Sequence, residues 1–369
     1  MVALSAFQFA QLSAAVGFAA APAHDAGESS LIVRVSAILA GLTCALLAGE
    51  ALAADSGVVL LYHKFGEENS PGTNIPLATF DAHIKELTSG KYHVMPLDEM
   101  LGAIKEKRAL PDRAVAITVD DGHPSIYARA FPRLKAAKLP FTLFVMTTPI
   151  DAHSKSAMSW DQLREMAKAG ATIAAHSATH PHMVEMDEEK AKAELVLSNK
   201  RIAEEIGAAP TLFAYPYGEV SARLIGLAKE VGYKYAVAEH SGVVDATTNS
   251  LLVPRFPMSD PYATMERLRQ VANALPIPTA DMTPADPLIT TPNPPNWGFT
   301  IAGDVGKLDG FACTASTEGR AKIERLGEKR IEVRLKKPFP QGRSRLNCTM
   351  PGPDGRWRWL GAEFYVSKK

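Results

Sequence analysis

The sequence predicts an α/β domain built on a parallel sheet, followed by a small all-β module. Three observations lead to this prediction. From Gly57 onward, short apolar runs rich in β-branched and aromatic residues alternate with amphipathic helical patterns, as in sheets that are buried on both faces. A proline-rich stretch occupies residues 276–295. Beyond it, short alternating runs are broken by Gly, Pro and Asp, which is typical of small antiparallel sheets.

The composition is that of an ordinary globular protein. The chain has 369 residues, with 40 Lys and Arg against 40 Asp and Glu, and 46% of its residues are hydrophobic. These values exclude a disordered chain, a fibrous repeat and a coiled coil. Because the formal net charge is zero, no overall attraction to nucleic acid is expected. The sequence gives no indication of the oligomeric state.

The N-terminal 53 residues resemble a targeting segment rather than part of the fold. Arg34 precedes an apolar run over residues 35–49, and the run ends in Ala51-Leu52-Ala53, a pattern of signal-peptide cleavage sites. The run is shorter than the roughly 20 residues that a membrane span needs. We therefore predict a signal peptide with an N-terminal extension over 1–53 and an exported protein, periplasmic or secreted. No stable membrane anchor is expected after cleavage. The alternatives to a signal peptide are a buried core helix or a membrane anchor.

The predicted strands and helices follow in alternation. The strands are expected at residues 58–62, 114–119, 141–146, 171–175, 211–214 and 235–238, and the clearest helices at 79–87, 160–169 and 187–206. Alternating βα units imply a parallel sheet, either a barrel or an open doubly wound sheet. Both architectures place functional residues at the carboxyl ends of the strands.

The domain boundaries are predicted from changes in composition. Residues 54–275 form the α/β domain, 276–295 a linker or strap with seven prolines, and 296–369 a β-rich accessory domain. This last part has 15 Lys and Arg against 8 Asp and Glu, so it is basic. It also contains Cys313 and Cys348, which an oxidising compartment favours as a disulfide. Two buried thiols are the alternative.

Several residues at the ends of the predicted strands have the chemistry of a metal site. Asp120 and Asp121 follow one strand, and His176 follows another, with His180 four residues later. Carboxylate and imidazole groups together suit zinc, iron, cobalt or nickel. A turn that begins at the two aspartates can direct one to the metal and leave the other as a general base. Each motif alone is weak, but their joint occurrence after buried strands predicts a site.

Residues 57–258 resemble the polysaccharide deacetylases of carbohydrate esterase family 4. The resemblance rests on the segments 118–122 (TVDDG), 176–182 (HSATHPH) and 213–218 (FAYPYG), together with Leu61-Tyr62-His63 and Trp160-Asp161. It implies a distorted (β/α) barrel and metal-dependent removal of acetyl groups from amino sugars. In motif style the sequence is closest to the poly-N-acetylglucosamine deacetylases of biofilms.

The resemblance also implies roles for individual residues. Asp120 is expected to be the base, and Asp121, His176 and His180 are expected to bind one divalent metal ion. Zinc is the first choice for this ion, with cobalt, nickel and iron as alternatives. The nucleophile would be metal-bound water, and the backbone N–H of Tyr217 would stabilise the oxyanion. The polysaccharide substrate is expected to contact Tyr215, Pro216, Tyr217, Gly218 and Trp160.

The sequence departs from the family pattern at two places. Ala214 stands where the family usually has an Arg that orients the base, and the usual Leu-x-His of the general acid is absent. His63 is our first candidate for the acid because it ends a strand on the same rim, and His240 is the second. A structural, hydrogen-bonded imidazole is the alternative for His63. Arg255 is a candidate partner of Asp120, either to orient the base or as a plain salt bridge.

These observations predict an enzyme that removes N-acetyl groups from an exported polysaccharide containing N-acetylglucosamine. Two alternatives remain open. One is an O-acetyl esterase that acts on acetylated polysaccharide, because an alkoxide leaves without a strong general acid. The other is a non-catalytic carbohydrate-binding protein on the same fold.

Overall fold

The computed structural model describes residues 53–368 of the chain. The predicted signal peptide and extension, residues 1–53, lie outside the described residues except for Ala53. Among the helices that are described, none has both the length and the apolar character needed to cross a membrane.

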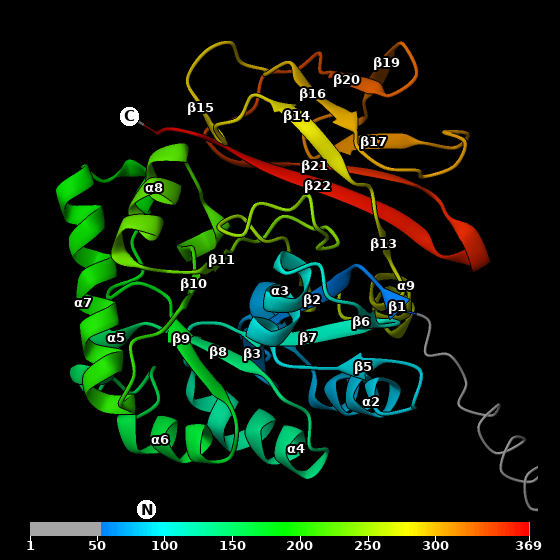
Figure 1. Cartoon of the computed structure of the whole chain (residues 1–369). Coiled ribbons are helices and arrows are strands. Elements are labelled where there is room, and N and C mark those ends of the chain that lie inside the picture. The colour runs from blue at the N-terminus through cyan, green and yellow to red at the C-terminus, as the bar shows by residue number, and fades with distance from the viewer. Residues whose placement is uncertain (1–52, 369) are drawn as a thin grey trace, which may run out of the picture. The chain divides into compact units, whose positions relative to one another are not determined.

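A parallel sheet of eight strands forms the centre of the α/β domain (Figure 1). Its order is β11-β10-β9-β8-β7-β2-β12, and β5 pairs with β7. A further parallel bridge between Val237 in β11 and Val253, shortly before β12, links the two outer strands. The predicted barrel-type fold is therefore confirmed. The strands are β2 (Gly57–Tyr62), β5 (His93–Val94), β7 (Ala114–Val119), β8 (Thr142–Val145), β9 (Thr172–Ala175), β10 (Leu212–Ala214), β11 (Tyr235–Val237) and β12 (Phe256–Pro257).

Both faces of this sheet are buried, which explains the near-continuous apolar runs in the sequence. In β2, Val58 and Leu60 belong to one hydrophobic cluster, whereas Val59 belongs to a second. The second cluster takes small residues from neighbouring strands, including Ala116 and Ala174.

The helices cover the sheet, and Figure 1 shows α4, α6 and α7 around its outside. The helix α7 begins after Asp187, whose carboxylate accepts a hydrogen bond from the Lys190 N–H, and ends at Gly207 with a φ of 93°. The α-helices of this domain are α2 (Leu77–Leu87), α3 (Leu97–Lys105), α4 (Phe131–Ala136), α5 (Thr147–Asp151), α6 (Trp160–Lys168), α7 (Glu188–Ile206), α8 (Ala222–Val231) and α9 (Met265–Ala272). Short strands β1 (Ala53–Ala54), β3 (Lys64–Phe65), β4 (Asn74–Ile75) and β6 (Leu110–Pro111) complete it.

The C-terminal part is all β, as predicted. Its longest element is the antiparallel pair β21 (Gly342–Pro351) and β22 (Trp357–Val366). Two sheets surround a core that contains Trp297, Phe299 and Phe364. The disulfide between Cys313 and Cys348 joins directly opposed residues of two adjacent strands, which confirms the predicted pairing. The other strands are β16 (Trp297–Ile301), β17 (Ala312–Ala315), β18 (Gly319–Arg320), β19 (Lys322–Leu326) and β20 (Arg330–Arg334).

The proline-rich segment 276–295, predicted as a linker or strap, contributes strands to these sheets. β14 (Thr279–Thr283) pairs with β16, and β15 (Leu288–Ile289) pairs with β22. Just before the segment, β13 (Leu275–Pro276) also pairs with β22. The segment is thus part of the β structure along much of its length. The domain boundaries themselves stay predictions.

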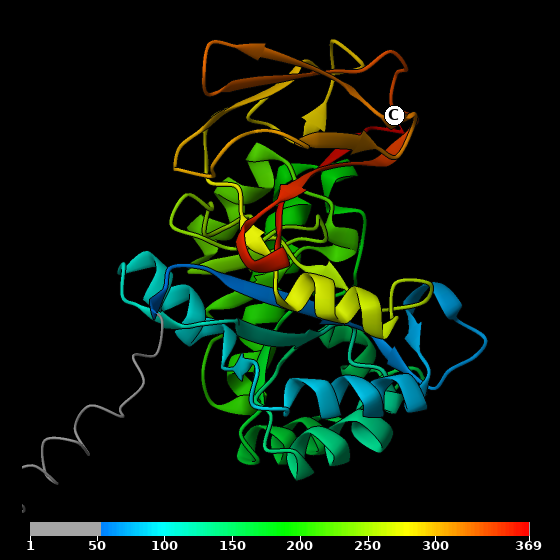
Figure 2. The same ribbon diagram turned by 90° about the vertical axis from the view of Figure 1, so that its right-hand side faces the viewer.

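The strand β22 also packs against the α/β domain (Figure 2). The indole ring of Trp359 lies edge-on to Phe256 in β12, with 5.4 Å between the ring centroids. The guanidinium of Arg267, from α9, lies 4.5 Å from the centre of the Trp359 ring. Hydrophobic and cation–π contacts therefore hold this strand beside the barrel.

Candidate active site

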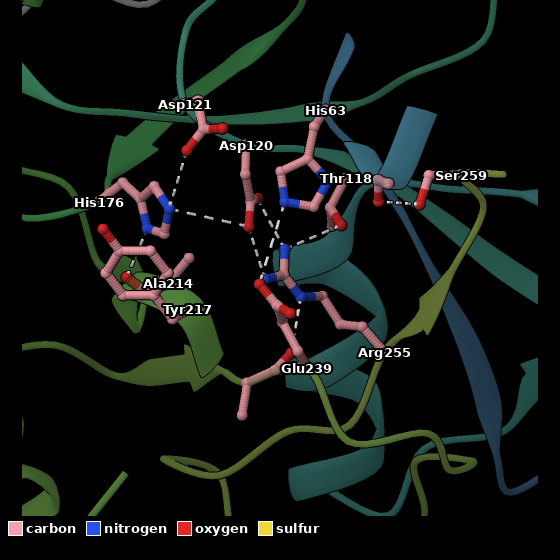
Figure 3. A network of polar contacts seen from close by, with 12 residues as sticks. His63, Thr118, Asp120, Asp121, His176, Ala214, Tyr217, Glu239, Arg255 and Ser259 are labelled. Atoms are coloured by element: carbon pink, nitrogen blue, oxygen red, sulfur yellow. Dashed lines mark hydrogen bonds and ion pairs between the residues drawn. The ribbon is translucent and has the colours of Figure 1, made fainter. Parts of the chain in front are cut away.

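The functional side chains lie where the parallel strands end. His63 follows β2, and Asp120 follows the neighbouring β7, with Tyr62 and Val119 in register. His176 follows β9, and Glu239 follows β11 after one further residue. Because these strands are parallel, their carboxyl ends gather at one rim, and Figure 3 shows the side chains pointing toward one another there.

Three side chains bring ligand-type atoms together. Asp121 Oδ1 lies 3.5 Å from Nε2 of His176 and 3.5 Å from Nε2 of His180, and the two nitrogens are 3.2 Å apart. Ligand atoms that bind one ion tetrahedrally at about 2.1 Å are separated by roughly 3.4 Å. The spacing of these three atoms therefore fits a tetrahedral zinc-type ion with one further position for water.

Neighbouring groups hold the three side chains in this orientation. The Nδ1–H of His176 donates to the carbonyl of Ala214 at 2.8 Å, which leaves Nε2 free as the ligand atom. His123 Nε2 contacts Asp121 Oδ2 at 3.0 Å, so the other carboxylate oxygen faces the histidines. The backbone N–H of His180 donates to Ser177 Oγ. Such partners around ligands are typical of metal sites.

The backbone is unusual at the same place. Asp121, Ser177, His180 and Tyr217 are non-glycine residues with positive φ values of 75°, 62°, 61° and 60°. This left-handed conformation costs about 1–3 kcal/mol for most residues and tends to occur at functional sites. The surrounding hydrogen bonds offset part of this cost and aim the side chains.

The charge states of two of the candidate ligands, Asp121 and His180, suit a cation. Burial opposes ionisation of Asp121, but hydrogen bonds from His123 and His176 hold its pKa well below the usual range. Burial, together with the neighbouring His176, lowers the pKa of His180 to about 4. Asp121 is therefore anionic and His180 neutral at pH 7, as metal ligands must be.

Asp120 is fully buried and paired with Arg255. The guanidinium donates to Oδ1 at 2.7 Å and to Oδ2 at 2.6 Å, and it also donates to Thr118 Oγ1 and the Ala238 carbonyl. Burial alone would raise the pKa of Asp120, but the charges of Arg255 and His176 outweigh it and lower the pKa. The predicted contact between these two residues is present. It keeps Asp120 ionised in a water-poor site.

His63 lies beside this pair. Three ligand-type atoms, one each from His63, Asp120 and Glu239, lie within 4.8 Å of one another. In this group both oxygens of Asp120 also accept hydrogen bonds from Arg255. His63 Nε2 is 3.9 Å from Glu239 Oε1, which is too long for a hydrogen bond. His63 therefore stands at the rim next to Asp120, with Glu239 at ion-pair but not hydrogen-bond distance from this nitrogen.

The second predicted acid, His240, is placed differently. It lines a cavity of about 360 Å³ together with Val243, Pro254 and Leu360. Among the described residues, the lining of this cavity does not include Asp120, Asp121, His176 or His180. Burial lowers its pKa to about 4. A neutral imidazole facing a different cavity is a poor general acid for this site.

The segment that carries Tyr217 closes one side of the cluster. Its ring lies 4.3 Å from that of His180 and stacks at 4.3 Å on His182. Gly218 has a φ of 70°, and a Cβ there would come within 2.7 Å of the Glu239 backbone nitrogen. Only glycine allows the two segments to approach this closely.

The structure buries four of the five residues predicted to contact the polysaccharide. Tyr215 is buried, and its hydroxyl donates to the Leu251 carbonyl at 3.0 Å, so its ring is part of the core. Trp160 is 8% exposed, donates to Asp151 and is covered by Arg201. Both side chains pack inside the protein instead of offering a surface to a sugar. Pro216 and Gly218 are also buried, which leaves Tyr217 as the accessible member of its segment.

Sequence reasoning missed three contributors. Glu239 follows β11, so the strand-end argument that selected His63 applies to it as well. His123, next to the aspartate motif, had no distinguishing pattern. Arg343 on β21 donates to the Tyr217 carbonyl at 2.6 Å, although the two residues are 126 positions apart. No local pattern signals such a distant contact.

The chain is similar to known deacetylases. Residues 107–236 match the family model described as polysaccharide deacetylase. Over 202 residues the chain is 28% identical to the poly-beta-1,6-N-acetyl-D-glucosamine N-deacetylase of Staphylococcus aureus, covering 51% of this chain and 68% of that protein. Two solved structures share the fold. The Streptococcus pyogenes deacetylase PplD in complex with acetate has a TM-score of 0.55 at 20% identity, covering 59% of this chain and 98% of that one. IcaB from Ammonifex degensii has a TM-score of 0.52 at 24% identity, and the match covers 60% of this chain and 97% of that one.

Proposed function

We propose that this chain, which is a member of the polysaccharide deacetylase family, removes N-acetyl groups from an exported polysaccharide that contains N-acetylglucosamine. The supporting observation is the convergence of Asp121, His176 and His180 on one point, with their ligand-type atoms 3.2–3.5 Å apart. We extend to this chain the substrate class named for the staphylococcal relative.

The residues divide the chemistry between them. A divalent cation held by Asp121, His176 and His180 would supply a Lewis acid that acidifies water and polarises the acetyl carbonyl. Asp120 accepts the proton of the attacking water. Tyr217 donates its backbone N–H to the carbonyl oxygen as negative charge develops there. His63 gives a proton to the departing amine.

The donor set supports zinc as the first choice of ion. Two imidazole nitrogens and one carboxylate oxygen suit zinc first, and cobalt, nickel or iron also bind such a set. The disulfide between Cys313 and Cys348 suits an oxidising compartment, which agrees with an exported enzyme and with the predicted signal peptide.

The experiment is an acetate-release assay on β-1,6-linked N-acetylglucosamine oligomers, combined with metal analysis. We expect chelation and dialysis to abolish activity and zinc to restore it. His176→Ala should lose both the ion and the activity. His93→Ala, which changes an exposed histidine on β5, is the matched control and should lose neither. Full activity of the metal-free protein would refute the proposal.

An O-acetyl esterase is the second candidate, and one observation favours it. His63 lacks a hydrogen bond to Glu239, whose nearest oxygen is 3.9 Å away, so the proton donor is not fixed in place. An ester needs this donor less than an amide, because an alkoxide leaves more readily than an amine anion. Rates on matched acetamido and acetyl-ester sugars separate the two candidates.

A further inference from the structure

Two arginines of the C-terminal β module extend into the candidate active site. Arg343 and Arg345 are two residues apart on β21, so their side chains leave the strand on the same face. Arg345 is directly opposite Glu363 on β22. The two arginines lie above the segment that carries Tyr217 and the end of β11.

The contacts of Arg343 and Arg345 are directed at residues of the site. Arg343 Nη1 donates to the Tyr217 carbonyl at 2.6 Å and to Glu239 Oε2 at 3.1 Å. Arg345 Nη2 donates to the same Glu239 oxygen at 3.3 Å, and its Nε donates to Glu363 Oε2 at 2.5 Å. Glu239 in turn lies beside His63. One ionic chain therefore links β22 to the rim of the barrel.

The bond to Tyr217 acts on a backbone that is held away from its preferred conformation. Tyr217 has φ 60° and ψ 5°, and a non-glycine residue leaves this region readily unless its neighbours hold it there. A charge-assisted bond to its carbonyl fixes the following peptide plane and so restricts ψ. The ring of Tyr217 is held from the other side by His180 and His182.

Stability alone does not account for this arrangement. The side chain of Arg343 is 35% exposed, and ion pairs at such positions contribute about 0–1 kcal/mol. The same bond placed at a reacting centre has a larger effect, since a displacement of about 1 Å can reduce a rate 100-fold. The contact is therefore better suited to orienting Tyr217 than to holding the fold together.

We propose that Arg343 is a positioning residue for deacetylation, which makes the C-terminal β module part of the catalytic unit. Arg343 holds Tyr217 so that its N–H faces the acetyl oxygen, and together with Arg345 it holds Glu239 at the rim. This inference rests on the proposed function and adds a role for the β module.

The test compares Arg343→Met with Arg334→Met in the full-length, metal-loaded protein. Arg334 is a matched control because it is 33% exposed, lies in the same module on β20 and bonds to Glu324 and Glu332. We expect R343M to lower kcat roughly 10- to 100-fold with KM within about threefold, and R334M to leave both unchanged. Both variants should bind the same amount of metal. R343K, which retains one donor for the Tyr217 carbonyl, should recover part of kcat.

A second measurement does not depend on turnover. In crystal structures of the two variants, we expect Tyr217 to leave its left-handed conformation and shift relative to His182 in R343M only. An unmoved Tyr217, or equal kcat values for R343M and R334M, would overturn the inference. Failure of the proposed function would look different, because the wild-type protein would then release no acetate while Tyr217 still moved in R343M.

Discussion

Both carboxylate oxygens of Asp120 accept a hydrogen bond from the Arg255 guanidinium, at 2.7 and 2.6 Å, and neither side chain is exposed to solvent. Arg255 reaches the base from just before β12, 135 residues further along the chain. The pairing serves two purposes. It compensates a buried negative charge, and it keeps the carboxylate ionised at a site where burial would favour protonation.

The first prediction concerns this pair. Arg255→Met should raise the pKa of Asp120, because burial would no longer be opposed by the guanidinium. A base must be deprotonated, so the acid limb of the kcat/KM profile should move to higher pH, and activity at pH 7 should fall. Loss of one partner should also cost about 3–5 kcal/mol in the free energy of unfolding. Activity between pH 5 and 9 and denaturant unfolding measure the two effects.

A double variant separates the catalytic effect from the structural one. Asp120→Asn combined with Arg255→Met removes both charges and should recover much of the lost stability. It should remain inactive, since no base is left. If R255M retained the wild-type pH profile, Arg255 would be a plain salt bridge without influence on the base.

The second prediction compares the two candidate acids. His63→Asn should reduce kcat on acetamido sugars about 100- to 10,000-fold, the usual contribution of a general acid. The loss on acetyl-ester sugars should be smaller, because the alkoxide leaves more easily. His240→Asn should change neither rate more than a few-fold, since His240 lines another cavity. A larger effect for His240→Asn than for His63→Asn would reverse our assignment.

The fold and the metal-type cluster were predictable because both depend on local patterns. Buried apolar runs identify the strands, and the residues directly after them identify Asp120, Asp121 and His176. The orientation of Tyr215 was also within reach. Alternation along β10 places Phe213 and Tyr215 on the same side, in the same hydrophobic cluster.

Other features depend on contacts that no local pattern records. Trp160 begins α6, and its place among the helices is decided by Asp151 and Arg201, which belong to other elements. The strands β14 and β15 form within a proline-rich segment because partner strands far along the chain pair with them. Tertiary pairing therefore overrides the composition that predicts a linker.

The third prediction concerns pH and stability. The Glu363 side chain is 4% exposed, and burial raises its pKa to about 7 despite the bond from Arg345. In the unfolded chain a glutamate titrates near 4.3. At a pH between these two pKa values, Glu363 has lost its proton in the unfolded state but keeps it in the folded state. The free energy of unfolding should therefore decline as pH rises from about 4.3 to about 7.

The variant Glu363→Gln removes this titration. Its stability relative to wild type should therefore improve from pH 5 to about pH 7 and then level off, as measured by denaturant unfolding at each pH from 5 to 9. Glu332→Gln is the matched control. Glu332 is a buried glutamate of the same module that also accepts hydrogen bonds from arginines. If E363Q and wild type differ by the same amount at every pH, Glu363 does not titrate in this range.

The fourth prediction concerns the disulfide that joins β17 to β21. Cys313 and Cys348 are both fully buried and close a loop with a sequence separation of 35 residues. Cross-linking such a loop lowers the entropy of the unfolded chain and stabilises the fold by about 4 kcal/mol in the loop-entropy model. Replacing both cysteines by alanine should therefore lower the Tm measured by calorimetry, and a reducing agent should lower the Tm of the wild-type protein but not that of the double variant. If the Tm of the wild-type protein were the same with and without reductant, the disulfide would not form in solution. Because β21 also carries Arg343, the double variant should lose acetate release at a lower temperature than the wild-type protein does.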